Sequence, residues 1–200
     1  DADAEQVNRG RFSLFFPEKR QFFLERAGIF DFTGVGNVRL FHSRRIGLSN
    51  DGVPIRILGG GRMVGRVGEW DLGMLDMQTA ATASTPSENF AALRLRRRTF
   101  NAGSYAGLML TGRMPAEGGA TSVAYGIDGT IQFGRQTYAS GSVSQSLVGG
   151  SGNLGSTAGV VHIERRAGSG FSYSQSLGWT GSDYDPGMGF VDRSGIARYD

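Results

Sequence analysis

From residue 53 onward, apolar and polar side chains alternate with a period of two, and this pattern limits the possible folds more than any other feature. Because successive side chains of a β-strand point to opposite faces, such a period predicts strands rather than helices. Five runs show it clearly: Ile55–Val67, Phe90–Thr99, Ser122–Gly134, Gly159–Arg166 and Gly170–Trp179. Three runs show it more weakly: Trp70–Thr79, Tyr105–Arg113 and Tyr138–Leu147.

The connections between these runs are mostly short and rich in glycine, serine and asparagine. Short turns join antiparallel neighbours, and no helical pattern of comparable length lies between the runs. The sequence therefore predicts an all-β antiparallel meander of about eight strands. Residues 1–50 differ in texture, because they hold eight of the 13 phenylalanines. We therefore expect a phenylalanine- and arginine-rich plug or periplasmic collar at 1–50 and strands over 51–200.

The polar faces of the runs help to distinguish a soluble sheet from a membrane-embedded one. A soluble surface carries many lysines and glutamates, whereas a membrane barrel turns its apolar face to lipid and its polar face inward. Here Lys19 is the single lysine beside 20 arginines, and aromatic residues stand near the ends of the runs. The 33 glycines suit tight turns and close packing in a curved sheet. We expect the strands to form part of a transmembrane outer-membrane β-barrel, with a soluble sandwich or solenoid as the alternative.

Composition and motifs exclude several other classes of protein. Without cysteine there is no disulfide scaffold and no thiolate metal site, and a net charge of +3 is weak for a nucleic-acid binder. His42 and His162 are the two histidines, and neither lies at a metal-ligand spacing from other donors. Gly59–Gly61 lacks the complete dinucleotide pattern, and Asp183–Gly189 lacks the acidic spacing of a calcium loop. We therefore expect no nucleic-acid partner, no metal, no cofactor and no enzymatic activity.

Arginines recur at alternate positions of several runs and are the most informative polar residues. On the inner side of a barrel they would line the lumen together with acidic residues. The expected lumen-lining residues are Arg56, Arg62, Arg66, Arg94, Arg96, Arg98, Asp128 and Glu164. Such a wall either attracts anions or holds an internal plug through ion pairs, and we favour the plug.

Two acidic residues of the N-terminal segment, Glu18 and Glu25, flank Arg20 and Arg26. A glycosidase would need both carboxylates to face one cleft at a separation of ~5–10 Å. No cleft can be argued from the sequence, which favours an ion-pair network that anchors a plug or periplasmic collar to the barrel wall. The expected members of this network are Glu18, Arg20, Glu25, Arg26, Arg44 and Arg45.

Four segments carry a resemblance to a known family: 8–25 (NRGRFSLFFPEKRQFFLE), 40–47 (LFHSRRIG), 57–66 (ILGGGRMVGR) and 187–193 (GMGFVDR). They resemble bacterial outer-membrane proteins in which a carbohydrate-binding-module-family-9-like domain precedes a C-terminal β-barrel domain of unknown function. The resemblance implies that the chain is the start of such a barrel, without the upstream glycan-binding-like module and with further strands beyond Asp200. Where the family typically has a lysine, this chain has Arg62, which keeps the charge. No catalytic motif of the barrel portion is implied.

Together these observations predict a non-catalytic outer-membrane β-barrel protein. It would act as a porin-like conduit or as a membrane anchor linked to a glycan-binding periplasmic module. Its expected location is the bacterial outer membrane. The expected partners are outer-membrane lipid, a glycan or anionic solute, and other envelope proteins. Two alternatives remain open: a structural subunit of a larger cell-envelope complex, and a glycan-binding or glycan-hydrolysing β-domain.

Overall fold

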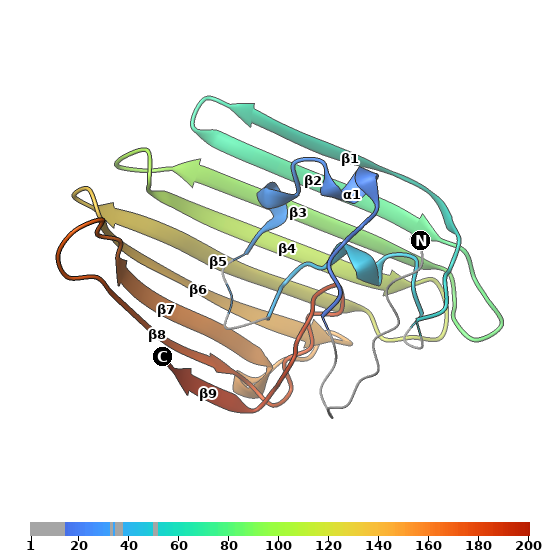
Figure 1. The fold of residues 1–200 in the computed structure, drawn as a ribbon. Helices are drawn as coiled ribbons and strands as arrows, with labels where there is room; N and C mark the ends of the chain where they lie inside the picture. Colours follow the sequence, from blue (N-terminus) through green and yellow to red (C-terminus); the bar gives the residue numbers. More distant parts are fainter. Residues whose placement is uncertain (1–14, 33, 35–37, 50–51) are drawn as a thin grey trace.

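The computed structural model describes residues 15–32, 34, 38–49 and 52–200 (Figure 1). Nine strands form one antiparallel sheet in which each strand pairs with the next along the chain. The strands are β1 (Ile57–Val67), β2 (Trp70–Thr79), β3 (Glu88–Arg98), β4 (Tyr105–Pro115), β5 (Ser122–Phe133), β6 (Thr137–Val148), β7 (Thr157–Arg165), β8 (Tyr173–Thr180) and β9 (Ile196–Tyr199). The predicted all-β antiparallel meander is therefore confirmed, with nine strands where about eight were expected.

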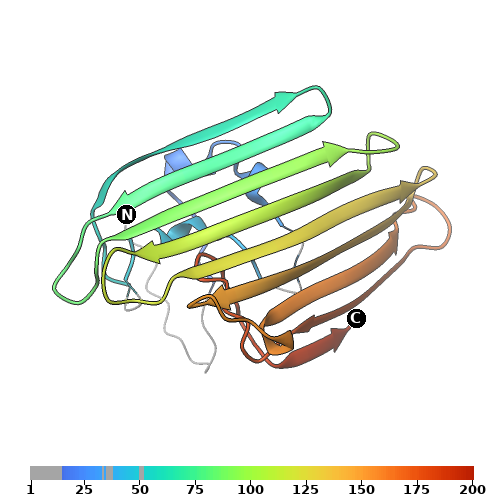
Figure 2. The same cartoon turned by 180° about the vertical axis from the view of Figure 1, so that it is seen from behind.

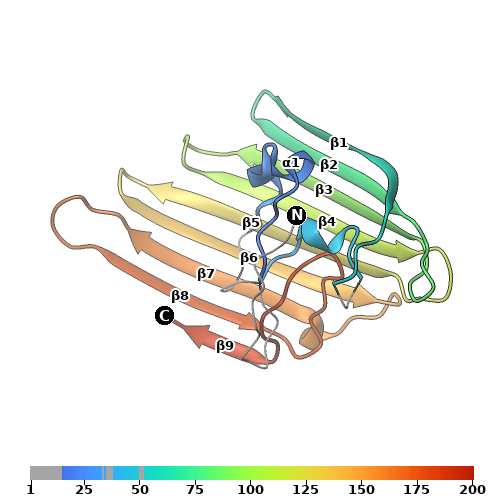
Figure 3. The ribbon, with the colours of Figure 1, turned by 45° about the vertical axis from the view of Figure 1, so that its right-hand side comes forward.

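Short helical turns accompany the sheet in the described part of the chain. They are α1 (Gln21–Leu24), η1 (Ala27–Phe30), η2 (Ser43–Arg45) and η3 (Leu154–Ser156). The first three lie against one face of the sheet (Figures 1 and 3). Among the described residues, no helix has the length and apolar character needed to cross a membrane.

The sheet is curved and has two very different faces. We call the face that carries α1, η1 and η2 the inner face, and the opposite face the outer face. Seen from behind, the outer face has no other described part of the chain lying over it (Figure 2). Strands β1 and β9 form the two edges and are not paired with each other within the described residues, so the sheet is not closed.

The hydrophobic core lies between the inner face and the described part of residues 15–48, which we call the inner segment. The inner segment contributes Phe23, Phe30, Leu40 and Ile46, all of them buried. The strands contribute Leu75, Met77, Phe90, Met109 and Ala124. Burying one large apolar side chain contributes about 1.5–3 kcal/mol, so this core fixes the inner segment on the sheet.

The β8–β9 loop, residues 181–195, completes the cover of the inner face. Arg39 and Phe190 exchange two backbone hydrogen bonds of 2.8 and 2.9 Å, which join this loop to the inner segment. Met188 of the loop is fully buried in the core. Segments far apart in the sequence are therefore held together on one side of the sheet.

The strand boundaries differ from the sequence expectations in small ways that have physical causes. A β-bulge between Ile57 and Gly59 shifts the alternation of β1. As a result Arg56, which is exposed and precedes β1, does not share the inner row of Arg62 and Arg66. The expected division between residues 50 and 51, and residues 1–14 of the expected plug or collar, lie outside the described residues.

Candidate functional site

Arg94 of β3 and Asp128 of β5 form a buried ion pair on the inner face, across the intervening strand β4. The guanidinium donates two parallel hydrogen bonds of 2.6 and 2.7 Å to the two carboxylate oxygens. Neither side chain has exposed surface, and the Tyr105 hydroxyl donates a third hydrogen bond of 3.0 Å to Asp128 Oδ2. Gly107 of β4 gives the pair its space, because a Cβ there would lie 2.6 Å from Asp128 Oδ1. Such bidentate pairs are strong and geometrically specific.

A second ion pair of the inner face joins Arg113 of β4 to Glu88 of β3. Its two hydrogen bonds measure 3.0 and 3.1 Å, and the guanidinium lies 5.8 Å from the centre of the Phe90 ring. Phe90 is paired with Arg113 in the register, so Glu88 is the diagonal neighbour two residues away. This pair was not predicted from the sequence, because it depends on the register of the two strands.

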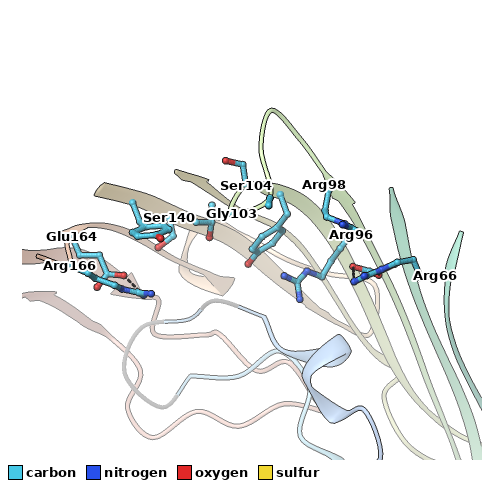
Figure 4. A pocket seen from close by; sticks show the side chains of 13 residues that line it. Arg66, Arg96, Arg98, Gly103, Ser104, Ser140, Glu164 and Arg166 are labelled. Atoms are coloured by element: carbon cyan, nitrogen blue, oxygen red, sulfur yellow. Dashed lines mark hydrogen bonds and ion pairs between the residues drawn. The ribbon is translucent and has the colours of Figure 1, made fainter. Parts of the chain in front are cut away.

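Beyond the buried pair, toward the turns at Gly68–Glu69 and residues 99–104, the inner face carries a cavity of about 390 Å³. Figure 4 shows it with Arg66, Arg96 and Arg98 on one wall and Glu164 and Arg166 on the other. We call this cavity the arginine hollow. Its charged and aromatic lining residues are Arg66, Asp71, Arg96, Arg98, Tyr105, Tyr138, Glu164 and Arg166.

Ion pairs and aromatic stacking order the arginine hollow. Arg66 forms a bidentate hydrogen-bonded pair with Asp71, and Arg166 is hydrogen-bonded to Glu164. The Arg96 guanidinium lies 3.9 Å from the centre of the Tyr105 ring, and Arg166 stacks on Tyr138 in the same way at 4.8 Å. Arg66, Arg96, Arg98 and Glu164 were predicted for this face, whereas the two tyrosines were not predicted as their partners. The alternation of the strands was the available signal for them.

Arg62 of β1 connects the sheet to the inner segment. It donates a hydrogen bond of 2.9 Å to the Phe22 carbonyl and lies 5.5 Å over the Phe30 ring. Arg94 makes a similar stacking contact of 5.6 Å with Phe32. These contacts show two of the expected arginines holding the inner segment through aromatic and carbonyl groups instead of carboxylates.

Glu18, Arg20 and Ser43 form a hydrogen-bonded clasp within the inner segment. Arg20 binds both oxygens of Glu18, at 2.9 and 2.8 Å, and also donates to the carbonyls of Ser43 and Ile46 at 2.7 Å each. The Ser43 hydroxyl donates to Glu18 at 2.6 Å. Burial alone would raise the pKa of Glu18, but these hydrogen bonds outweigh it and lower the pKa to about 2.

The other residues expected in this network lie in different surroundings. Arg44 donates to the Pro17 carbonyl at 3.1 Å, and Arg45 donates to the Gly189 carbonyl at 3.1 Å. Glu25 and Arg26 are exposed, and within the described residues neither has an ion-pair partner. Glu18 and Glu25 therefore have no shared hydrogen-bond partner in the described part of the chain, and the clasp occupies both oxygens of Glu18.

The two histidines also lie apart. His42 packs against Phe15 and Phe190, with ring centres 4.9 and 5.9 Å away, while His162 lies 3.8 Å from Glu164 on β7. Among the described residues, no three histidine, aspartate or glutamate side chains come together as metal ligands. Comparisons with known proteins found no matching family model, no matching curated protein and no matching solved structure.

Proposed function

We propose that this chain is a stretch of outer-membrane β-barrel wall that acts as a non-catalytic membrane anchor for a glycan-binding periplasmic module. The outer face would contact lipid, and the inner segment would serve as an internal plug. The module is proposed on the sequence resemblance alone. The membrane location rests on the chemistry of the outer face.

The single observation that carries the proposal is the apolar band on the outer face. Large apolar side chains project outward from eight of the nine described strands, all but β3, and are exposed. They are Met63, Val67, Trp70, Met74, Leu108, Leu110, Met114, Tyr125, Ile127, Ile131, Phe133, Val143, Val161, Ile163, Leu177, Trp179 and Tyr199. A continuous exposed apolar surface of this kind is unusual on a soluble monomer and is typical of a lipid-facing wall.

The charged residues of the outer face lie toward the ends of their strands. On the outer positions of the described strands they are Asp76, Arg97 and Arg165. Arg165 ends β7, Arg97 is the last residue but one of β3, and Asp76 lies three residues before the end of β2. A charged side chain is tolerated near the membrane interface and is costly at the midplane, so this placement fits a strand that crosses a bilayer.

The inner face favours an anchor over an open conduit. The core residues of the inner segment and the buried Arg94–Asp128 pair fill the middle of the inner face, with no exposed surface on either charged side chain. Water and solutes would have to displace this packed layer to pass. We therefore expect planar bilayers that contain the folded protein to show no conductance steps, and regular steps would favour the porin-like alternative.

The two tryptophans provide the direct test of lipid contact. Trp70 and Trp179 both lie on the outer face and are 48% and 39% exposed. In vesicles of brominated phosphatidylcholine we expect the fluorescence of both to be quenched by the lipid, most strongly by bromines near the interface, where tryptophans anchor. Aqueous iodide should quench them weakly. Strong iodide quenching without lipid quenching would contradict the proposal and favour a soluble β-domain.

A further inference from the structure

The arginine hollow holds more positive than negative charge within pairing distance. Asp71 is paired with Arg66, and Glu164 is paired with Arg166. Arg96 and Arg98 line the same hollow and form no ion pair among the described residues, and the charge of Asp71 acts on both of them at longer range. The hollow therefore contains two guanidinium groups whose charge the described residues do not neutralise by direct contact.

Arg96 is positioned as a binding group. Its Cζ lies 3.9 Å from the centre of the Tyr105 ring, so stacking fixes the plane of the guanidinium. Its Nε is buried and has no hydrogen-bond partner among the described residues. Figure 4 shows Arg96 on the same wall of the cavity as Arg66 and Arg98.

The inner segment does not supply the missing negative charge. A second cavity, which shares Arg66, Asp71 and Arg96 with the hollow, is bordered on the inner-segment side by Arg26, Gly28 and Ile29. The charged residue among these three is a further cation. Arg26 also has a left-handed backbone, with φ of 46°, which is uncommon for a residue other than glycine. Arg96 therefore differs from Arg62, which contacts a carbonyl and a ring of the inner segment directly.

We propose that the arginine hollow binds a small solute that carries a phosphate or carboxylate group. The forked donors of Arg96 and Arg98 match the geometry of such oxyanions. A volume of about 390 Å³ leaves room for a molecule larger than a bare ion. Thr130 and Ser140 add hydroxyl groups that suit a polyol. The site forms on the inner face whether or not the outer face contacts lipid, so its test is separate from that of the anchor.

The experiment uses the folded full chain in detergent micelles and measures heats of binding for pyrophosphate and, separately, for citrate, at constant ionic strength set with chloride. The two probes distinguish a phosphate-bearing ligand from a carboxylate-bearing one. The variants are Arg96→Gln and Arg98→Gln. The matched control is Arg97→Gln, which makes the same change of charge on the same strand but on the outer face, where Arg97 lies 3.7 Å from Glu69.

We expect saturable binding of at least one probe, with affinity about tenfold lower in Arg96→Gln and in Arg98→Gln, because each removes a charge-assisted donor. Arg97→Gln should bind like the unchanged protein. Arg98 is exposed, so its variant keeps the proposal testable if Arg96→Gln fails to fold. Two results would overturn it: no saturable binding of either probe, or an equal loss in the Arg97 control, which would indicate non-specific attraction by net charge.

Discussion

Asp128 accepts three side-chain hydrogen bonds inside the sheet, two from Arg94 and one from Tyr105. Taking two charges out of water is costly, and good geometry offsets that cost only while both partners are present. The energetic importance of Asp128 therefore lies mainly in what its loss would leave behind, an unpaired guanidinium with no exposed surface. Stability at this position depends on the pair as a unit.

Replacing Asp128 with Asn should lower the free energy of unfolding by about 3–5 kcal/mol, because it leaves the Arg94 charge buried and unpaired. The double variant Arg94→Met with Asp128→Leu should recover most of this loss, since it removes both charges. Urea unfolding in detergent, followed by tryptophan fluorescence, measures the difference. If the double variant proves as unstable as Asp128→Asn, the loss comes from packing and not from charge.

Gly126 of β5 lies where the inner segment touches the sheet. A Cβ at this position would come within 2.6 Å of the Phe32 ring and within 2.8 Å of the Ser144 side chain. The absence of a side chain here lets an aromatic ring of the inner segment rest directly on the strand. Some of the many glycines thus serve contact between two layers of the molecule and do not serve turns.

Gly126→Ala should displace Phe32 and loosen the inner segment, so trypsin should cleave this arginine-rich segment faster than in the unchanged protein. Gly65→Ala is the matched control, because it changes a glycine of β1 that has no atom within 4 Å of the added Cβ. We expect the control to be cleaved at the rate of the unchanged protein. Equal cleavage in Gly126→Ala and the control would contradict this contact.

At the scale of elements, the inner segment combines an apolar core with groups that respond to acid. Burial and the guanidiniums of Arg45 and Arg39 lower the pKa of His42 to about 4, although Glu18 opposes them. Because this is below the usual value of 6.5, the unfolded chain takes up the proton first as the pH falls. The contribution of neutral His42 to stability is therefore present above pH about 6.5 and is lost between about 6.5 and 4.

Acidification should accordingly weaken the inner segment in two stages. His42 acts first, and the Glu18 clasp follows as the pH falls below about 4.5 toward its pKa of about 2. Titration of the imidazole signals by nuclear magnetic resonance should place the midpoint of His42 near 4. The variant His42→Gln should remove the first stage from the pH dependence of stability. A His42 midpoint near 6.5 would show that the ring is solvated.

The strands that sequence analysis found most easily are those whose two faces differ most in polarity. In β5 the outer positions are large and apolar except for Gly129, while the inner ones are small or polar, so the alternation is plain. In β2 the inner Leu75 and Met77 are buried under the inner segment, and the outer Leu72 and Met74 are apolar as well. The alternation in β2 was therefore weak, because a strand with apolar side chains on both faces does not show a period of two.

The alternation also predicted part of the candidate site, because it shows which face a side chain lies on but not which residues it contacts. Alternation placed Arg62, Arg66, Arg94, Arg96 and Arg98 on one face of the sheet. It could not pair Arg94 with Asp128, because that contact crosses β4 and depends on the register of three strands and on a glycine between them. Nor did it place Arg56 outside the row, although the glycines at 59–61 beside the bulge are a signal that often marks one.

For the whole molecule, the proposed membrane location makes a prediction about depth. Ile127 stands in the middle of β5 and Phe133 at its end, on the same outer face and with similar exposure of 57% and 54%. In a bilayer, Ile127→Lys should cost about 2–4 kcal/mol of stability and Phe133→Lys about 0–1 kcal/mol, because a charge costs most at the midplane. Urea unfolding from lipid vesicles measures both. Equal costs would indicate that water, and not lipid, covers this face.

The bulge between Ile57 and Gly59 has a further consequence for how such a chain tolerates insertions and deletions. When one residue is added to or lost from a strand, every side chain between that point and the next turn moves to the opposite face of the sheet. Arginines would then point outward and apolar side chains inward. In β1 the bulge lies before Arg62 and Arg66, so an extra residue near Ile57 changes the path of the chain without exchanging the faces of the rest of the strand. Changes of length should therefore be accepted at this end of β1 and in the turns, and elsewhere in the strands only in pairs.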